Sequence, residues 1–308
     1  MMEEKIEDTK LLTERARHIL DEIFATGKYE EFIKGMVHHS NYSINNQALI
    51  MEYAPYATEM KSMRAWNYLG RYVKDNETGT PTLSPVFNQQ DKETNKSRGE
   101  LTGFQVSYRF DTSQTGGSPY RSLRCQEGEA ARYSDLIIQY LENTLISQCK
   151  GEDQDQYSLR NIYENTNFKE LDSEDKVRVI VEETNLQLLL NKIMNQKYSG
   201  LIEAEKMGIN EVMLSAINYI TLTRLGLEAD AIVVPNLYNF TSLEYGRFKN
   251  SLETMRQTAQ IVINSAESAI NMGRKAELLQ EARESMKKSR EDKDIRSDKP
   301  KKDFTPER

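Results

Sequence analysis

The segment from Lys61 to Lys74 combines residue types that bind a phosphate backbone and stack on bases. It reads K-S-M-R-A-W-N-Y-L-G-R-Y-V-K, with four basic residues, aromatic residues between them and no acidic one. Basic side chains neutralise phosphates, and each aromatic ring that stacks on an unpaired base contributes about 1–3 kcal/mol. The segment therefore predicts a nucleic-acid interface formed by Lys61, Arg64, Trp66, Tyr68, Arg71, Tyr72 and Lys74.

The same segment has a second interpretation, a short helix on the surface of a core. Trp66 and Leu69 would then face inward, and the basic side chains would only form a solvated face. Composition alone favours this second interpretation, because the run is short and a tryptophan in a short helix usually belongs to the core.

A polar cluster, N-Y-S-I-N-N-Q, occupies residues 41–47 upstream of the basic segment. Its amide, tyrosine and serine side chains could contact bases or the sugar-phosphate backbone. The competing interpretation is helix capping and turn formation, with Ser43 as the N-cap. The residues alone favour capping. His38 and His39 precede the cluster, and we expect them on the surface rather than on phosphate.

The composition of the whole chain narrows the class of protein. A length of 308 residues predicts two domains. The net charge is −7, so the basic segment is a local reversal of sign. Histidine occurs only at positions 18, 38 and 39, and cysteine only at 125 and 149. These counts exclude a multi-zinc or iron–sulfur protein, and they exclude a histidine triad or an H-E-x-x-H site beyond residue 39.

Membrane insertion and secretion are not expected. No stretch approaches the ~20 consecutive apolar residues that span a bilayer. The N-terminus is acidic and has no apolar signal region. We therefore expect a cytoplasmic protein without a membrane partner, and we expect its two cysteines to be thiols.

Hydrophobic periodicity predicts mostly helices around a small β region. Helices are expected near residues 9–25, 30–37, 43–54, 60–69, 128–150, 174–195, 200–225 and 242–290. Strands are expected at 82–87 and 104–110, with loops at 88–100 and 115–119. Residues 150–172 are predicted to be irregular. The chain from 287 to 308 is charged and almost free of apolar residues, which predicts a disordered tail that is basic up to residue 302.

Three motifs occur in a fixed order: N-Y-S-I-N-N-Q-A-L-I (41–50), A-T-x-x-x-S-M-R-A-W-N-Y-L-G-R-Y-V-K (57–74) and F-Q-V-S-Y-R-F-D-T-S-Q-T-G (104–116). Together they resemble the N-terminal domain of the ArdC-like antirestriction proteins, which include the LtrC-like proteins of conjugative elements. The resemblance covers roughly residues 10–117. It implies an α+β domain that binds single-stranded DNA.

The resemblance makes a set of residues candidates for facing DNA or shaping its site: Asn41, Tyr42, Asn45, Asn46, Trp66, Arg71, Tyr72 and Lys74. With the basic residues Lys61 and Arg64 they form the expected DNA-binding site. One departure from the family lies after the V-K pair. The family has a basic glycine turn there, whereas this chain has the acidic run 75–79, D-N-E-T-G, which weakens phosphate contact.

The resemblance continues into a second domain. Family members often carry a zinc peptidase-like domain whose metal ligands come from H-E-I-A-H and a later glutamate. The corresponding residues here are Val181, Asn185 and Ser215, which are poor or impossible zinc ligands, and Glu182 remains at the position of the general base. A new carboxylate site formed by Glu182, Glu183 and Glu211 is the less favoured alternative. We expect no catalytic residue, no metal and no cofactor.

The sequence thus predicts an α+β protein in three parts. Residues 8–117 form a single-stranded DNA-binding domain, residues 118–272 a mainly helical, zincin-like domain without catalysis, and residues 273–308 a charged helix end and disordered tail. The expected function is a DNA-binding accessory protein of a plasmid or conjugative element, of the antirestriction type. The alternative is a non-catalytic inhibitor that binds a host restriction or defence enzyme. A host defence or conjugation protein is thus a second candidate partner beside single-stranded DNA.

Overall fold

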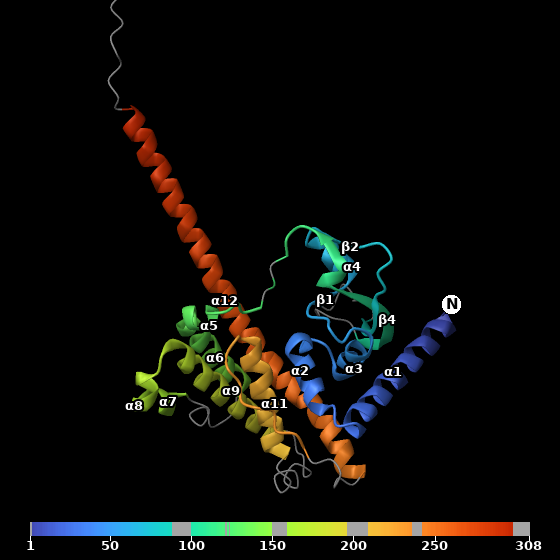
Figure 1. The fold of residues 1–308 in the computed structure, drawn as a ribbon. Helices are drawn as coiled ribbons and strands as arrows, with labels where there is room; N and C mark the ends of the chain where they lie inside the picture. The colour runs from blue at the N-terminus through green and yellow to red at the C-terminus, as the bar shows by residue number, and fades with distance from the viewer. Residues whose placement is uncertain are drawn as a thin grey trace, which may run out of the picture.

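The computed structural model describes residues 2–87, 100–120, 122, 124–149, 159–195, 209–235 and 242–297. It is an α+β structure in which helices predominate and the sheets are small and antiparallel (Figure 1). The N-terminal part contains α1 (Met2–Ala25), α2 (Tyr29–His39), α3 (Ile44–Tyr53), β1 (Met60–Lys61), α4 (Met63–Tyr68), β2 (Arg71–Val73), β3 (Thr80–Phe87), β4 (Leu101–Asp111) and β5 (Thr115–Gly117).

The C-terminal part is helical. It contains α5 (Glu129–Arg132), α6 (Ser134–Gln148), α7 (Arg160–Glu164), α8 (Thr166–Glu170), α9 (Ser173–Asn195), α11 (Ile209–Arg224) and α12 (Ser242–Ser297). Figure 1 shows α12 as a long diagonal helix, with the β region on one side of it and α5, α6 and α9 on the other. Its C-terminal half projects beyond the other helices. None of the helices in the described ranges is long and apolar enough to cross a membrane.

Local signals place most helix ends where the sequence predicts them. The Ser43 side chain accepts a hydrogen bond from the backbone N–H of Asn46, which confirms Ser43 as the N-cap of α3. α1 and α4 end just before Gly27 and Gly70, whose φ angles are both 72°. This left-handed conformation costs glycine little, so the glycines stop the two helices as expected.

Two buried apolar clusters share α12. One joins α1, α2 and α3 to α11 and the first turns of α12, with Phe248 stacked edge-on against Phe24 at 5.5 Å between ring centroids. The other joins α5, α6 and α9 to the middle of α12. Core residues from both sides of residue 117 thus pack together, while the expected domain bounds stay predictions.

Three arginines from separate segments bind the C-terminal carbonyls of α2. Arg224 on α11 donates to the carbonyl of Val37 at 3.1 Å, Arg124 donates to that of His38 at 3.3 Å, and Arg256 on α12 donates to that of Ser40 at 2.9 Å. Cations at a helix C-terminus satisfy its unpaired carbonyls and oppose its dipole. The end of α2 is therefore fixed from three directions.

Several local expectations are corrected. The helix predicted at 60–69 begins at Met63, because residues 60–61 pair with β4 as a strand. The predicted loop at 115–119 contains β5, and the irregular stretch 150–172 contains α7 and α8. α12 continues to Ser297, so the disorder expected from 287 is wrong up to that point: Glu, Lys, Arg and Met favour helix even without a core contact. Residues 298–308, most of the loop predicted at 88–100 and the start of the helix predicted at 200–225 lie outside the described residues.

Candidate nucleic-acid interface

The D-T-S-Q motif at residues 111–114 fixes the loops around the basic segment. One carboxylate oxygen of Asp111 accepts hydrogen bonds from the backbone N–H groups of Thr58 and Glu59 at 2.8 and 2.9 Å. The other accepts from the N–H and the hydroxyl of Ser113. Burial alone would raise the pKa of Asp111, but these hydrogen bonds lower it below its usual value. The conspicuous aspartate is thus a structural anchor.

Gln114 completes the same frame. Its carbonyl oxygen accepts from the backbone N–H of Asp111 at 2.9 Å, which forms a capping box with the carboxylate. Its amide donates to the Glu77 carboxylate at 2.9 Å and to the Thr78 carbonyl at 3.0 Å. The acidic turn at residues 75–79 therefore contacts the Asp111 frame.

Trp66 lies inside the structure with 0% of its surface exposed. Its indole N–H donates to the carbonyl of Phe110 at 2.9 Å, and its ring meets Tyr120 edge-on at 5.1 Å. Lys61 lies over both rings at 5.4 Å and pairs with Glu59 at 2.5 Å. Trp66 and Lys61 are therefore placed to shape the site. In this structure Trp66 offers no free face for base stacking.

Arg71 and Lys74 are also engaged by the protein itself. Arg71 donates to the side chain of Thr115 at 2.9 Å and to the carbonyls of Thr115 and Ser118 at 3.0 and 2.5 Å. Lys74 donates to the carbonyl of Ser113 at 2.8 Å and stays exposed. Both side chains tie β2 to the chain around β5, and both keep their positive charge near the surface.

The glycines of β5 allow this tight pairing. A Cβ on Gly117 would lie 2.6 Å from the carbonyl oxygen of Gly70, and Gly117 has a φ of 107°. A Cβ on Gly116 would lie 3.0 Å from the ring of Tyr72. The T-G-G run therefore serves as a close-packed strand, although its composition predicts a loop.

We call four of the exposed side chains of the segment the tyrosine surface: Arg64, Tyr68, Tyr72 and Lys74. Tyr68 is 92% exposed and Tyr72 is 60% exposed. Arg64 and Tyr68 are four residues apart on α4, so they share one helix face, and α4 contacts β2, which carries Tyr72. The four side chains thus come from α4, from β2 and from the residue after β2, and exposed aromatic rings and cations are the groups that single-strand binding uses.

The N-Y-S motif divides into buried and exposed members. The amide of Asn46 donates to the carbonyl of Leu83 at 2.9 Å and accepts from its N–H at 2.7 Å, so it pairs with the edge strand β3 as a neighbouring strand would. The Tyr42 hydroxyl donates to the carbonyl of Met60 at 2.8 Å. Asn45 is half-buried and Asn41 is exposed. Asn41 is therefore the member of the motif most open to a ligand.

The sequence does not mark several exposed aromatic residues, and it places one histidine wrongly. Tyr56 is 93% exposed between α3 and β1, and Phe104 and Tyr108 are 54% and 58% exposed on one face of β4. The alternation of β4 puts these two on the same face as the buried Phe110, so the sequence pattern alone predicts them to be buried. His39 was expected at the surface, but it is only 5% exposed, because α2 packs that side against α3 and the loop at Ala57.

The residues at the expected zinc centre do not fit a metal. Val181 and Asn185 are fully buried in the core between α9 and α11. The Asn185 amide donates to Asn218 at 2.9 Å and to the Thr221 hydroxyl at 2.8 Å, and the Ser215 hydroxyl accepts from the N–H of Val233 at 2.8 Å. No group of three or more His, Cys, Asp or Glu side chains suited to a metal occurs among the described residues. The absence of catalysis remains a proposal.

Of three comparisons with known proteins, the one with solved structures gives matches. No protein-family model and no curated protein matches the chain. Among solved structures it is similar to the antirestriction protein ArdC from plasmid R388. The Mn(II)-bound structure of ArdC has 14% identity and a TM-score of 0.36, and the match covers 86% of this chain and 97% of that one. The metal-free structure has 15% identity and a TM-score of 0.32, and covers 78% and 84%.

Proposed function

We propose that the chain is a single-stranded DNA-binding accessory protein of the antirestriction type, carried by a plasmid or conjugative element and acting without catalysis. The observation that carries the DNA-binding part is the tyrosine surface. Tyr68 and Tyr72 are exposed in the same short segment as the exposed cations Arg64 and Lys74, in a chain whose net charge is −7. The antirestriction part rests on the three motifs and their order.

The proposed binding mode follows from this arrangement. Unpaired bases stack on Tyr68 and Tyr72, and the phosphates between them meet Arg64 and Lys74. A duplex keeps its bases stacked inside, so it can use only the phosphate contacts. Arg71 adds positive charge from its fixed position beside Trp66, whereas the charge of Lys61 is offset by Glu59. The mode therefore favours single strands and depends on salt.

A second candidate function is inhibition of a host enzyme through protein contact. A groove of about 640 Å³ lies between α1 and the β3–β4 sheet, and Leu11, Tyr53 and Tyr108 line it with large exposed areas. Exposed apolar side chains gathered in one groove are typical of a protein-binding surface. The groove favours this alternative and makes no use of the tyrosine surface.

One titration separates the two. A fluorescent 20-base oligo(dT) and a duplex of the same length are titrated with the full chain at low and moderate salt. The proposal expects tighter binding of the single strand and a loss of affinity as salt rises. Equal binding of both forms, or none, would overturn it. Binding of host proteins through the groove would then be sought with Tyr53→Ala as the matched variant.

A further inference from the structure

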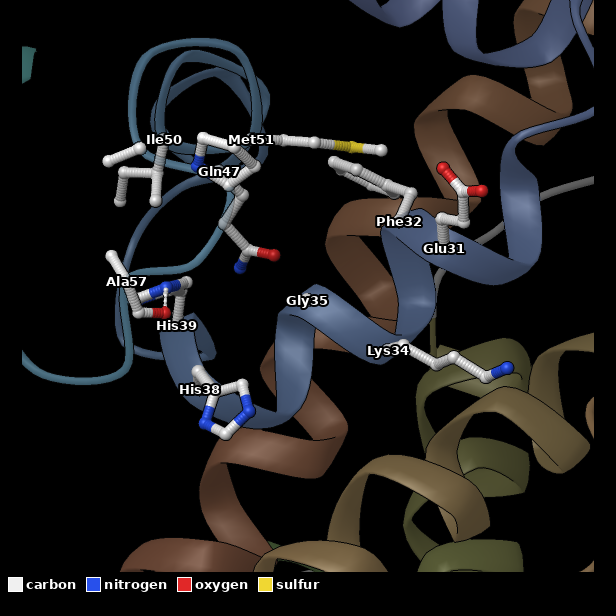
Figure 2. Close-up of a pocket in the computed structure, with 12 residues that line it drawn as sticks. Glu31, Phe32, Lys34, Gly35, His38, His39, Gln47, Ile50, Met51 and Ala57 are labelled. Atoms are coloured by element: carbon white, nitrogen blue, oxygen red, sulfur yellow. Dashed lines mark hydrogen bonds between the residues drawn. The ribbon is translucent and has the colours of Figure 1, made fainter.

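A cavity of about 320 Å³ lies between α2, α3 and the loop that follows α3. Apolar residues form most of its wall, chiefly Phe32, Ile50, Met51 and Ala57. Figure 2 shows Gln47 reaching from α3 toward α2 at Gly35, with His39 near Ala57. A Cβ built on Gly35 meets nothing within 4 Å, so the cavity has open space at this point of α2.

The hydrogen bond made by Nε2 of His39 makes the other ring nitrogen, Nδ1, a hydrogen-bond acceptor. Nε2 lies 2.9 Å from the carbonyl oxygen of Ala57, and a carbonyl only accepts, so Nε2 carries the proton. Burial lowers the pKa of His39 to about 4, so the ring is neutral at pH 7. Nδ1 then has a lone pair and no proton. Within the described chain this buried atom has no hydrogen-bond partner.

Gln47 supplies a second acceptor of the same kind. Its amide nitrogen donates to the carbonyl of Tyr42 at 2.9 Å, which orients the carboxamide and leaves the oxygen on the opposite side. Gln47 is 4% exposed, and its oxygen also lacks a partner among the described residues. A buried acceptor without a donor costs about 1–3 kcal/mol. Both residues line the same cavity, where a donor group of a ligand or of water would satisfy these two acceptors.

We propose that this cavity receives an amino-bearing nucleobase (adenine, cytosine or guanine) of a bound single strand, whose amino N–H groups donate to Gln47 and His39. The proposal rests on the single-strand binding proposed above and names the base class. The cavity has the size of a small ligand site, and its apolar walls suit a planar ring. Thymine has no amino group, and carbonyl oxygens flank its one base-pairing N–H. In the cavity these oxygens would face the acceptor atoms of Gln47 and His39, with no hydrogen between them.

The position of the cavity connects it to the proposed DNA path. Pro55 and Ala57 line it, and Tyr56 between them is 93% exposed. When one base of the bound DNA lies in the cavity, the exposed ring of Tyr56 can stack on the next base along the strand. Four residues later in the chain, Met60 and Lys61 begin the strand that leads into the basic segment. The residues that would contact the bound DNA, Tyr56 and the tyrosine surface, therefore come from consecutive parts of the protein chain.

The test uses oligonucleotides that differ in one base. The full chain is titrated with oligo(dT) and with oligo(dT) that carries one central adenine, cytosine or guanine. We expect each amino-bearing base to tighten binding about three- to tenfold, as one or two hydrogen bonds do. Gly35→Leu fills the cavity and abolishes this preference, and it leaves the affinity for oligo(dT) unchanged. Gly35→Ala, which adds a single methyl group, reduces the preference if the larger variant folds poorly.

Gly246→Leu on α12 is the matched control, because a Cβ there also meets nothing within 4 Å and Gly246 does not line the cavity. It should keep the preference. Equal affinity for all oligonucleotides, or a preference that survives in both Gly35 variants, overturns the cavity proposal and leaves single-strand binding standing. Failure to bind any of these oligonucleotides overturns the proposed function itself.

Discussion

The indole N–H of Trp66 donates a 2.9 Å hydrogen bond to the backbone carbonyl of Phe110. This bond joins α4 to the strand that leads into the Asp111 frame. It keeps Trp66 inside the structure, while Tyr68 two residues later is 92% exposed. Trp66 thus supports the tyrosine surface from inside the structure, and Tyr68 belongs to that surface.

The first prediction concerns this division of roles. Trp66→Ala removes a fully buried ring and should lower the free energy of unfolding by about 3–5 kcal/mol. Thermal unfolding followed by circular dichroism measures the effect. Tyr68→Ala is the control, since its side chain is exposed, and it should leave the melting temperature nearly unchanged. Equal effects of the two variants would contradict the burial of Trp66.

The second prediction concerns the Asp111 frame. Asp111→Asn replaces one acceptor oxygen by a donor and removes the charge, so the chain should lose about 1.5–3 kcal/mol of stability at pH 7. The folded pKa of Asp111 is lowered, so its stabilisation is present above its ordinary pKa of 3.8 and is lost as the pH falls through the lowered value. Urea unfolding at pH 7 and pH 3 measures the difference. An equal deficit of the variant at both values would contradict this role.

The sequence predicts the fold best where local signals decide it. Apolar spacing predicts α1, and Ser43 and Gly27 mark helix ends through short-range hydrogen bonds and backbone preference. β5 and the burial of His39 depend on contacts with distant residues, so the local pattern points the wrong way for both. The same holds for the site. The basic segment is recognisable and its composition favours a buried Trp66, but only packing decides that Tyr56 is exposed.

The third prediction concerns pH. Burial lowers the pKa of His38 and His39 to about 4, with the charges of Arg124 and Arg224 adding to the effect at His38. An unfolded histidine binds a proton near pH 6.5, whereas these do so only near pH 4. Stability is therefore complete above about pH 6.5 and falls as the pH drops toward 4, by up to about 3 kcal/mol for the buried His39 and by less for the partly exposed His38, whose charge solvent screens. His39→Gln should flatten the slope measured by urea unfolding; an unchanged slope in His39→Gln and His38→Gln would contradict it.

The fourth prediction concerns the second part of the chain. Val181, Asn185 and Ser215 form no metal site, so Zn²⁺ or Mn²⁺ should leave the melting temperature unchanged, since a bound metal stabilises the folded state by mass action. Differential scanning fluorimetry with each ion and with chelator measures this. A rise of several degrees with one ion at micromolar concentration would overturn the non-catalytic proposal.

The central claim is that the tyrosine surface binds single-stranded DNA. The most direct measurement is the dissociation constant of fluorescent oligo(dT) for the unmodified chain and for the double variant Tyr68→Ala/Tyr72→Ala. Tyr108→Ala on β4 is the control, because Tyr108 is 58% exposed and Tyr72 is 60% exposed. Loss of two stacking contacts of about 1–3 kcal/mol each predicts at least a tenfold weaker affinity for the double variant, an unchanged melting temperature and a normal affinity for Tyr108→Ala. Undiminished binding by the double variant would contradict the account.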